Sequence, residues 1–403
     1  MHILFVHKNF PAQFGHIAGH LVKNKGFRCT FVSEKPAGWS GGIEKIQYTL
    51  EGGATAKTNF CSRSFENAIW HSEAIFHAMK SRPDIQPDLI VGHSGFACTL
   101  FLRELYDCPI VNYFEYFYRT TDSDVDFRKE FPLDEKSLLR VRARNAMLLL
   151  DLDDCDAGYS PTGWQRSRLP KQYQDKIHVI FDGIDTNIWQ PRQNVPRVIS
   201  GENIPDDVKI VTYVSRGLES MRGFDIFMKV AKTLCDRRND VIFVVVGEDR
   251  ICYGGDERFI GGNSFKQWVL AHDDYDLSRI LFLDRIPPQE LANLFSITNL
   301  HLYLTVPFVL SWSMMNALAC GAVVLASDTA PVKEMIVHGT NGLLADFFDI
   351  EQFANDAEKV LENPNEFSHL GKAGIEMIRE KYSLDVCLPK MLDLYSSVLN
   401  KGV

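Results

Sequence analysis

Short apolar runs alternate with longer segments of helical periodicity along most of the chain. Continuous apolar strands placed between helices are typical of parallel sheets that are covered on both faces. In the first half, the expected strands are residues 2–7, 28–33, 89–93, 110–113, 157–160 and 177–180, and the expected helices are residues 12–25, 64–81, 95–106 and 134–153.

The alternation is interrupted at residues 181–205, which contain two glycines and three prolines, and then starts again. We therefore predict an α/β protein with two doubly wound, Rossmann-like domains, residues 1–185 and 186–382, that face a deep cleft. Residues 383–403 are expected to form a further helix. In the second half we expect strands at residues 209–214, 241–246, 280–283, 300–304 and 322–326, and helices at residues 224–237, 288–296, 311–320, 332–337, 350–362 and 365–381.

Composition narrows the classes of protein. The chain has 403 residues, 45% of them hydrophobic and 24% charged, which fits a globular protein of two domains. A net charge of −9 argues against a nucleic-acid partner. Nine cysteines without a CxxC pair, and histidines without ligand-spaced partners, predict neither disulfides nor a bound metal. The apolar run in MHILFVHKNF is too short for a signal peptide, so we expect a cytoplasmic protein.

One segment, residues 307–328 (PFVLSWSMMNALACGAVVLASD), carries the most specific signal. It reads as a turn, a helix of small residues, a stop at Gly321 and a buried strand. The N-terminus of such a helix presents free backbone N–H groups and the positive end of the helix dipole, so it attracts anions. From spacing alone, a packed helix–strand unit without a ligand explains the pattern equally well.

This segment resembles the nucleotide-sugar segment of retaining glycosyltransferases of family 4, which have the GT-B fold. In that family two glutamates precede an AMACG-like run; here Phe308 and Asn316 occupy their positions before ALACG, and a branch of the family likewise has PFVLSW. The resemblance implies that Asn316 hydrogen-bonds the ribose of the donor. It also implies that the backbone of Val309, Leu310 and Ser311 meets the donor sugar or phosphate.

Two arginines stand where the family holds the diphosphate. The segment VTYVSRGLESMRGFDIFM resembles the GR…KG element of the family, with Arg216 at the family's Arg and Arg222 at its Lys. A leaving diphosphate needs positive charge as the glycosidic bond breaks, and guanidinium groups supply it. Two solvated loop arginines are the alternative reading of this segment taken alone.

A third match concerns the nucleobase. The run DRIPPQEL, residues 284–291, resembles the base-recognition loop of the family, with the backbone of Arg285 and Ile286 facing the base. Glu290 is interpreted as a charge at a helix N-terminus. Backbone recognition does not identify the base, and UDP is favoured over GDP or ADP as the donor nucleotide.

In the first domain, His93 ends the strand LIVGH and is therefore expected to face the ligand side of the sheet. It resembles the family histidine that binds a hydroxyl of the donor sugar. Gly15 ends the loop FPAQFG, which resembles the glycine-rich first loop of the family. Glu115, in an aromatic surround, together with Asp122 and Asp124, is the candidate acceptor side; a solvated loop is the favoured alternative for the two aspartates.

The resemblance implies a retaining glycosyltransferase with a nucleoside-diphosphate-sugar donor and no tightly bound cofactor, in which the C-terminal helix returns to the first, acceptor-binding domain. The acceptor is a glycan, a lipid-linked saccharide, a protein or a small molecule. His93, Arg216 and Arg222 are the candidate catalytic residues. The alternatives are a nucleotide-sugar-binding scaffold with a degenerate donor site and a GT-B epimerase. The basic helix 134–153 is compatible with peripheral membrane contact, although an ordinary surface helix is favoured.

Overall fold

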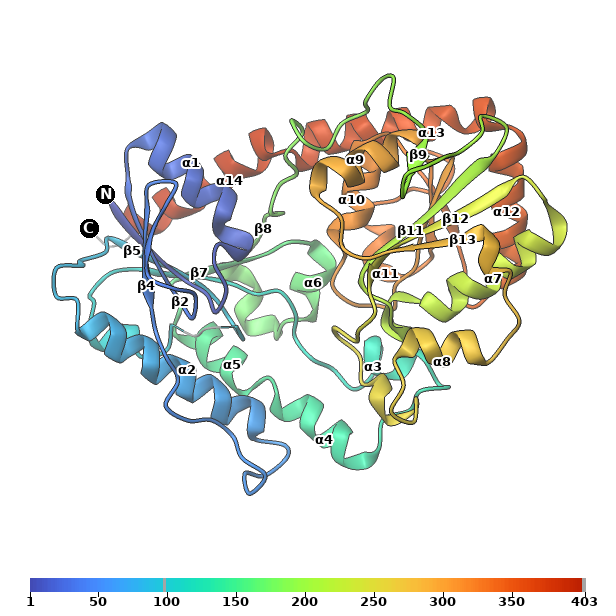
Figure 1. The fold of residues 1–403 in the computed structure, drawn as a ribbon. Helices are drawn as coiled ribbons and strands as arrows, with labels where there is room; N and C mark the ends of the chain where they lie inside the picture. Colours follow the sequence, from blue (N-terminus) through green and yellow to red (C-terminus); the bar gives the residue numbers. More distant parts are fainter. Residues whose placement is uncertain (97–98, 401–403) are drawn as a thin grey trace. The chain divides into compact units, whose positions relative to one another are not determined.

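The structure is a computed structural model that describes residues 1–96 and 99–400. The chain forms two compact units, and it passes between them four times (Figure 1). Unit 1 comprises residues 1–121, 133–183 and 384–403, and unit 2 comprises residues 122–132 and 184–383. The assignment of residues 122–132 to unit 2 differs from the sequence analysis, which placed them in the first domain.

Unit 1 is built on an eight-stranded sheet with the order β3-β4-β2-β1-β5-β6-β7-β8. All neighbouring strands are parallel except β3 and β4. The strands are β1 (His2–Val6), β2 (Arg28–Ser33), β3 (Gly38–Ser40), β4 (Ile43–Gln47), β5 (Leu89–His93), β6 (Ile110–Tyr113), β7 (Ala157–Ser160) and β8 (Ile177–Val179). The longer helices are α1 (Gly15–Lys25), α2 (Arg63–Lys80), α4 (Glu135–Ala143), α5 (Ala146–Asp154), α6 (Gly163–Arg168) and α14 (Leu384–Leu399).

Two hydrophobic cores lie on the two faces of this sheet. Side chains alternate along a strand, so Ile3 and Phe5 of β1 join one core while Leu4 and Val6 join the other. The first core is closed by α1 and by α14, which lies beside α1 (Figure 1). The C-terminal helix therefore packs within unit 1, although the 200 residues 184–383, which belong to unit 2, precede it.

Two expected helices of unit 1 differ in the structure. The described part of residues 95–106 forms only a short 3-10 turn, Leu102–Glu104, and residues 97–98 lie outside the described residues. The expected helix 134–153 is divided into α4 and α5. The division falls beside Asn145, whose side chain donates to the Tyr118 carbonyl (2.8 Å) and accepts from its N–H (2.9 Å).

Unit 2 has a six-stranded parallel sheet with the order β13-β12-β11-β14-β15-β16. Helix α7 packs against α12 on one side, and α10 packs against α9 and α13 on the other (Figure 1). Its strands are β11 (Lys209–Gly217), β12 (Val241–Glu248), β13 (Ile280–Leu283), β14 (Leu300–Tyr303), β15 (Val324–Ser327) and β16 (Leu343–Ala345). Its helices are α3 (Asp124–Phe127), α7 (Phe224–Arg237), α8 (Phe265–Ala271), α9 (Pro288–Ile297), α10 (Trp312–Ala319), α11 (Ala330–Lys333), α12 (Ile350–Glu362) and α13 (Pro364–Met377).

The sequence pattern missed several short elements. Within residues 181–205, expected to be irregular, β9 (Val198–Ile199) and β10 (Glu202–Asn203) form an antiparallel hairpin. Strands β3, β4 and β16 and helix α8 were also not predicted, because three to seven residues carry little periodicity. Among the described residues, no helix combines the length and apolarity needed to cross a bilayer.

Replacing Leu394 of α14 by Ala should lower the free energy of unfolding of unit 1. The side chain is buried in the first core, and removing such a group costs about 2–5 kcal/mol. Urea unfolding of the full chain measures the change. Ser396→Ala, at an exposed position of the same helix, should change stability by less than about 0.5 kcal/mol. Equal effects of the two substitutions would contradict the packing of α14.

Candidate functional site

The strand order of unit 2 places its candidate site. Strands β11 and β14 lie next to each other at the centre of the sheet, and the chain continues outward from them in opposite directions. Ligands of open α/β sheets bind at such a switch point, beside the carboxyl ends of the strands. Arg216 lies at the carboxyl end of β11, Arg222 lies in the loop that follows it, and residues 305–311 follow β14.

Arg222 ends a 3-10 turn, Ser220–Arg222, and its side chain is 3% exposed. Its Nη1 donates to Oγ1 of Thr305 (2.8 Å), which follows β14. Its carbonyl oxygen accepts from the hydroxyl of Tyr213 (2.7 Å) in β11. The turn is thus attached to both central strands.

The guanidinium of Arg222 lies against two aromatic rings, at 5.0 Å from the centroid of Tyr253 and 5.8 Å from that of Phe308. Burial alone would lower its pKa, but Tyr303, Tyr253 and Glu219 together raise the pKa, so the group is charged. Among the described residues, no carboxylate forms an ion pair with it. Buried charges in proteins are normally paired, which makes Arg222 a candidate for binding an anion from outside the chain.

Gly223 permits this arrangement. It has φ +61°, and a Cβ there would come within 2.7 Å of Cβ of Leu304. A residue with a side chain would be strained in this conformation and would push the turn away from the strand. Because Gly223 has no side chain, the turn that carries Arg222 can pack closely against the end of β14.

Glu219 is a functional candidate that the sequence analysis missed. It is fully buried, and its Oε2 accepts from the backbone N–H groups of Cys252, Tyr253 and Gly254 (3.0, 2.9 and 2.9 Å). These bonds fix the loop after β12 and so hold the ring of Tyr253 against Arg222. Nothing in the local pattern around Tyr253 indicated this contact.

Arg216 differs from Arg222 in its surroundings. It precedes Gly217, the last residue of β11, at the carboxyl end of the strand, and its side chain is exposed. The structure thus brings both predicted arginines to the same edge of the sheet. One is available to solvent, and the other is fixed in the protein.

The loop from β14 to α10 has the predicted form. Ser311 is the N-cap of α10: its hydroxyl accepts from the N–H of Ser313 (3.2 Å), and its own N–H donates to the Tyr303 hydroxyl (2.8 Å). Leu310 is buried and Val309 half-buried in the same loop.

Asn316 is buried in the second turn of α10, at 7% exposure, and its side chain makes no hydrogen bond to any described residue. Its amide is therefore able to bind a ligand. The predicted contact between Asn316 and the ribose stays a prediction.

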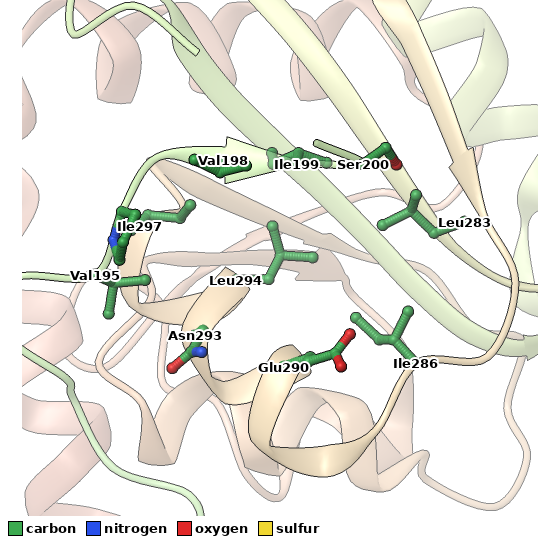
Figure 2. A pocket seen from close by; sticks show the side chains of 11 residues that line it. Val195, Val198, Ile199, Ser200, Leu283, Ile286, Glu290, Asn293, Leu294 and Ile297 are labelled. Carbon is green, nitrogen blue, oxygen red and sulfur yellow. The ribbon is translucent and has the colours of Figure 1, made fainter. Parts of the chain in front are cut away.

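The predicted base loop lies two strands from β11. Arg285 is exposed between β13 and α9, and Ile286 lines a pocket of about 430 Å³. Figure 2 shows the side chains of Ile286, Leu294 and Leu283 directed toward this space from one side, with the hairpin strand β9 across from them. The pocket is mainly apolar and contains none of the candidate phosphate-binding residues.

In unit 1, His93 lies at the end of β5, next to β1, where the strand order also reverses. It was expected to face the ligand side, but its side chain is fully buried because the rings of Phe96 and Tyr113 lie at 4.7 and 4.8 Å from it. Burial lowers its pKa to about 3. Nδ1 donates to the Ser94 carbonyl (3.0 Å), which leaves Nε2 of the neutral ring as a hydrogen-bond acceptor.

Nε2 of His93 has no hydrogen-bond partner among the described residues, and Oε2 of Glu115 lies 3.9 Å from it. The structure therefore brings together two of the predicted residues of the first domain. A second histidine, His7, lies 5.1 Å from His93 between ring centroids and was missed. It follows β1, so the rule that selected His93 would also have found it.

The ring of His7 is held by the backbone of Asn9, whose N–H lies 2.8 Å and whose carbonyl oxygen lies 3.0 Å from Nδ1. Its Nε2 has no hydrogen-bond partner among the described residues. Burial lowers the pKa of His7 to about 4.

The other predicted residues of the first loop and acceptor side are placed as follows. Gly15 begins α1, where a Cβ would lie 3.0 Å from the ring of Pro11, so close packing explains its lack of a side chain. Asp122 and Asp124 belong to unit 2, whereas Glu115 belongs to unit 1. Asp124 begins α3, and the N–H of Asp122 donates to Asp126 (2.7 Å) at the start of that helix.

In the described ranges, no cluster of metal-binding side chains is present.

Comparison with known proteins identifies the family. The description "Glycosyl transferase family 4 group" matches residues 25–189, and "Glycosyl transferases group 1" matches residues 195–377. The chain belongs to the family 4, group 1 glycosyltransferases.

Curated relatives include D-inositol 3-phosphate glycosyltransferase of Gordonia bronchialis, 24% identical over 62% of this chain and 54% of the relative. Another is the alpha-maltose-1-phosphate synthase of Mycolicibacterium smegmatis, 23% identical over 56% of this chain and 57% of the relative. The chain thus spans little more than half the length of these two relatives. The first is named as a glycosyltransferase and the second as a synthase, and this chain is a glycosyltransferase of family 4, group 1.

Solved structures show the same fold. Sucrose-phosphate synthase from Thermosynechococcus elongatus superposes with a TM-score of 0.74 at 17% identity, covering 100% of both chains. Alr3699/HepE from Anabaena, in complex with UDP and glucose, has a TM-score of 0.70 at 14% identity, covering 98% of this chain and 99% of that one. The glycosyltransferase therefore has the GT-B fold, as predicted.

Acid should destabilise unit 1, because His7 and His93 are neutral in the folded protein. Their folded pKa values, about 4 and about 3, lie below the value of 6.5 expected after unfolding. The unfolded state therefore binds more protons, and the free energy of unfolding falls as the pH decreases from about 6.5 to about 4. Each histidine contributes up to about 1.4 kcal/mol per pH unit.

Urea unfolding between pH 7.5 and 4.5 measures this dependence. His93→Phe keeps an aromatic ring in the cluster and should reduce the slope, whereas replacement of the exposed His16 by Asn should leave it unchanged. A wild-type slope in His93→Phe would show that this ring is not held neutral by the fold.

Proposed function

We propose that this glycosyltransferase moves a sugar from a nucleoside-diphosphate sugar to an acceptor hydroxyl, with retention of the anomeric configuration. The observation that carries the proposal is the buried, charged guanidinium of Arg222, which has no ion-pair partner among the described residues. It lies at the switch point of a parallel sheet, where ligands bind.

In the proposed reaction, the acceptor oxygen forms a bond to the anomeric carbon while the bond from that carbon to the diphosphate breaks. The leaving phosphate takes the proton of the acceptor hydroxyl on the same face of the sugar. Arg222 and Arg216 stabilise the negative charge that develops on the diphosphate, together with the N-terminus of α10. Fixed donors are effective here because they need no reorganisation during the reaction.

The neutral state of His93 suits contact with a sugar. Its Nε2 is an acceptor, so we assign it to a hydroxyl of the donor sugar rather than to phosphate. An uncharged imidazole binds a hydroxyl without attracting the diphosphate. Glu115, at 3.9 Å from this nitrogen, is assigned to the same region, near the acceptor.

A UDP sugar is the proposed donor. Support comes from Alr3699/HepE, whose structures are complexes with UDP and with UDP-glucose. The backbone of Arg285 and Ile286 is assigned to the base, and the loop containing Val309, Leu310 and Ser311 to the sugar or phosphate. The enzyme is proposed to work in the cytoplasm. No tightly bound cofactor is required by this scheme.

One observation favours a second function. Asn316 and Phe308 replace the two glutamates of the family's donor segment, which would suit a nucleotide-sugar-binding scaffold. A panel of UDP, GDP and ADP sugars, each with and without candidate acceptors, separates the two. Product with retained configuration, identified by NMR of the anomeric proton, supports transfer. Binding without turnover of any donor would favour the scaffold, and epimerised donor would indicate an epimerase.

Arg222→Ala should lower kcat by about two to three orders of magnitude, the loss seen when a fixed transition-state donor is removed. Steady-state kinetics with the best donor of the panel measure the loss. The control is Arg250→Ala: Arg250 lies in the next loop, half exposed and paired with Glu248. Unchanged kinetics in Arg222→Ala would remove this residue from the site.

Asn316→Glu should tighten UDP binding roughly tenfold or more, because a carboxylate can form a charge-assisted hydrogen bond to ribose. Asn316→Gln, which has the length of Glu without its charge, is the matched control. Titration calorimetry with UDP measures both. If the two variants bind UDP as the natural enzyme does, Asn316 does not contact the ribose.

A further inference from the structure

Residues 122–132, here called the arm, leave unit 1 after Thr121 and return to it at Leu133, yet they fold as part of unit 2. Two phenylalanines hold the arm in place. Phe127 lies 5.2 Å from the rings of both Phe347 and Phe348. Phe131 packs at the other end, at 5.4, 5.9 and 6.0 Å from the rings of Phe259, Phe265 and Trp268.

Between these two contacts lies Arg128, a 5% exposed residue with all five of its N–H donors engaged. Nη1 and Nη2 donate to the two carboxylate oxygens of Asp225 (2.8 and 2.7 Å) at the start of α7. Nη2 and Nε donate to Glu130 (2.6 and 2.8 Å). The remaining donor, on Nη1, is directed to the carbonyl oxygen of Ser220 (2.9 Å).

Ser220 begins the turn that carries Arg222. Its N–H and hydroxyl both donate to the buried carboxylate of Asp256, at 2.8 and 2.5 Å. Its carbonyl accepts from the N–H of Gly223 (2.9 Å) as well as from Arg128. The position of the turn is thus fixed by charged side chains from two other parts of the chain.

We propose that Arg128 is a positioning residue for the diphosphate site: it holds the Ser220 turn, and through it the guanidinium of Arg222. The proposal rests on the proposed function, since it assumes that Arg222 meets the diphosphate. It assigns a role to the arm, which the family resemblance placed at the acceptor side through Asp122 and Asp124.

Charge alone does not account for Arg128. An ion pair with Asp225 would anchor the arm even if the side chain were lysine. Only the planar guanidinium can bind Asp225 with two parallel bonds and still reach Ser220 and Glu130, because lysine has three donors on one nitrogen. Arg128→Lys therefore keeps the charge and disturbs the link to the turn.

A double-mutant cycle with UDP as the probe tests the proposal. Arg128→Lys, Arg222→Ala and the double variant are compared by titration calorimetry and by donor turnover. If Arg128 acts through Arg222, Arg128→Lys should weaken UDP binding roughly tenfold in the natural enzyme and have almost no effect when Arg222 is already Ala. The control is Arg237→Lys: Arg237 ends the same helix α7 and pairs with Glu351 and Glu358.

Hydrogen–deuterium exchange supplies a readout that does not depend on activity. Arg128→Lys should speed exchange at the amides of Arg222 and Gly223, which bond to Glu219 and Ser220, and leave those in the middle of α7 unchanged. Such a local change together with coupling in the cycle supports the proposal.

Unchanged exchange at the turn, or the same loss of UDP affinity in both backgrounds, would overturn the role of Arg128 and leave the proposed function standing. Failure of the natural enzyme to bind any nucleoside diphosphate would instead overturn the proposed function, and this inference with it.

Discussion

The buried positive charge of Arg222, which has no carboxylate partner among the described residues, is the constraint on which unit 2 depends. Taking a guanidinium out of water costs several kcal/mol, and an ion pair would normally offset that cost. Here Arg222 has one hydroxyl, Thr305, and two aromatic rings instead. Rigid surroundings are needed to keep it there: Gly223 allows close approach to β14, and Glu219 fixes the loop of Tyr253. We propose that an anionic ligand balances the charge of Arg222.

Unit 1 also has its candidate site residues at the switch point of a mostly parallel sheet, but they are neutral histidines instead of arginines. The strand order reverses between β1 and β5, and His7, which follows β1, lies beside His93 at the end of β5. Burial keeps both rings neutral. Backbone contacts hold both rings, that of His93 through the Ser94 carbonyl and that of His7 through Asn9, and the Nε2 atom of each ring has no hydrogen-bond partner among the described residues. Neutral groups of this kind suit sugar hydroxyls, while the charged groups of unit 2 suit phosphate.

The fold and the positions of Arg216 and Arg222 could be predicted from the sequence, because both are indicated by local sequence patterns. Buried parallel strands read as apolar runs, and Arg216 and Arg222 follow one of them. The features that were missed depend on contacts between distant parts of the chain. Arg128 looks like any charged loop residue until Asp225, 97 positions later, is brought to it. The long helix expected at residues 134–153 is broken beside an asparagine that binds the backbone of Tyr118. The hydropathy pattern indicates neither the contact of Arg128 with Asp225 nor that of Asn145 with Tyr118.

The central claim is that the site recognises the diphosphate, and comparison of UDP with uridine in titration calorimetry tests it most directly. Both ligands carry the same base and ribose, so the difference in affinity reports the phosphates alone. Because the buried guanidinium of Arg222 has no carboxylate partner in the described part of the chain, UDP should bind at least about a hundredfold more tightly than uridine, since charged hydrogen bonds contribute about 1.5–3 kcal/mol each. Raising the salt concentration should reduce this preference only slightly, because buried charges are poorly screened. Equal affinity for UDP and uridine would contradict the account.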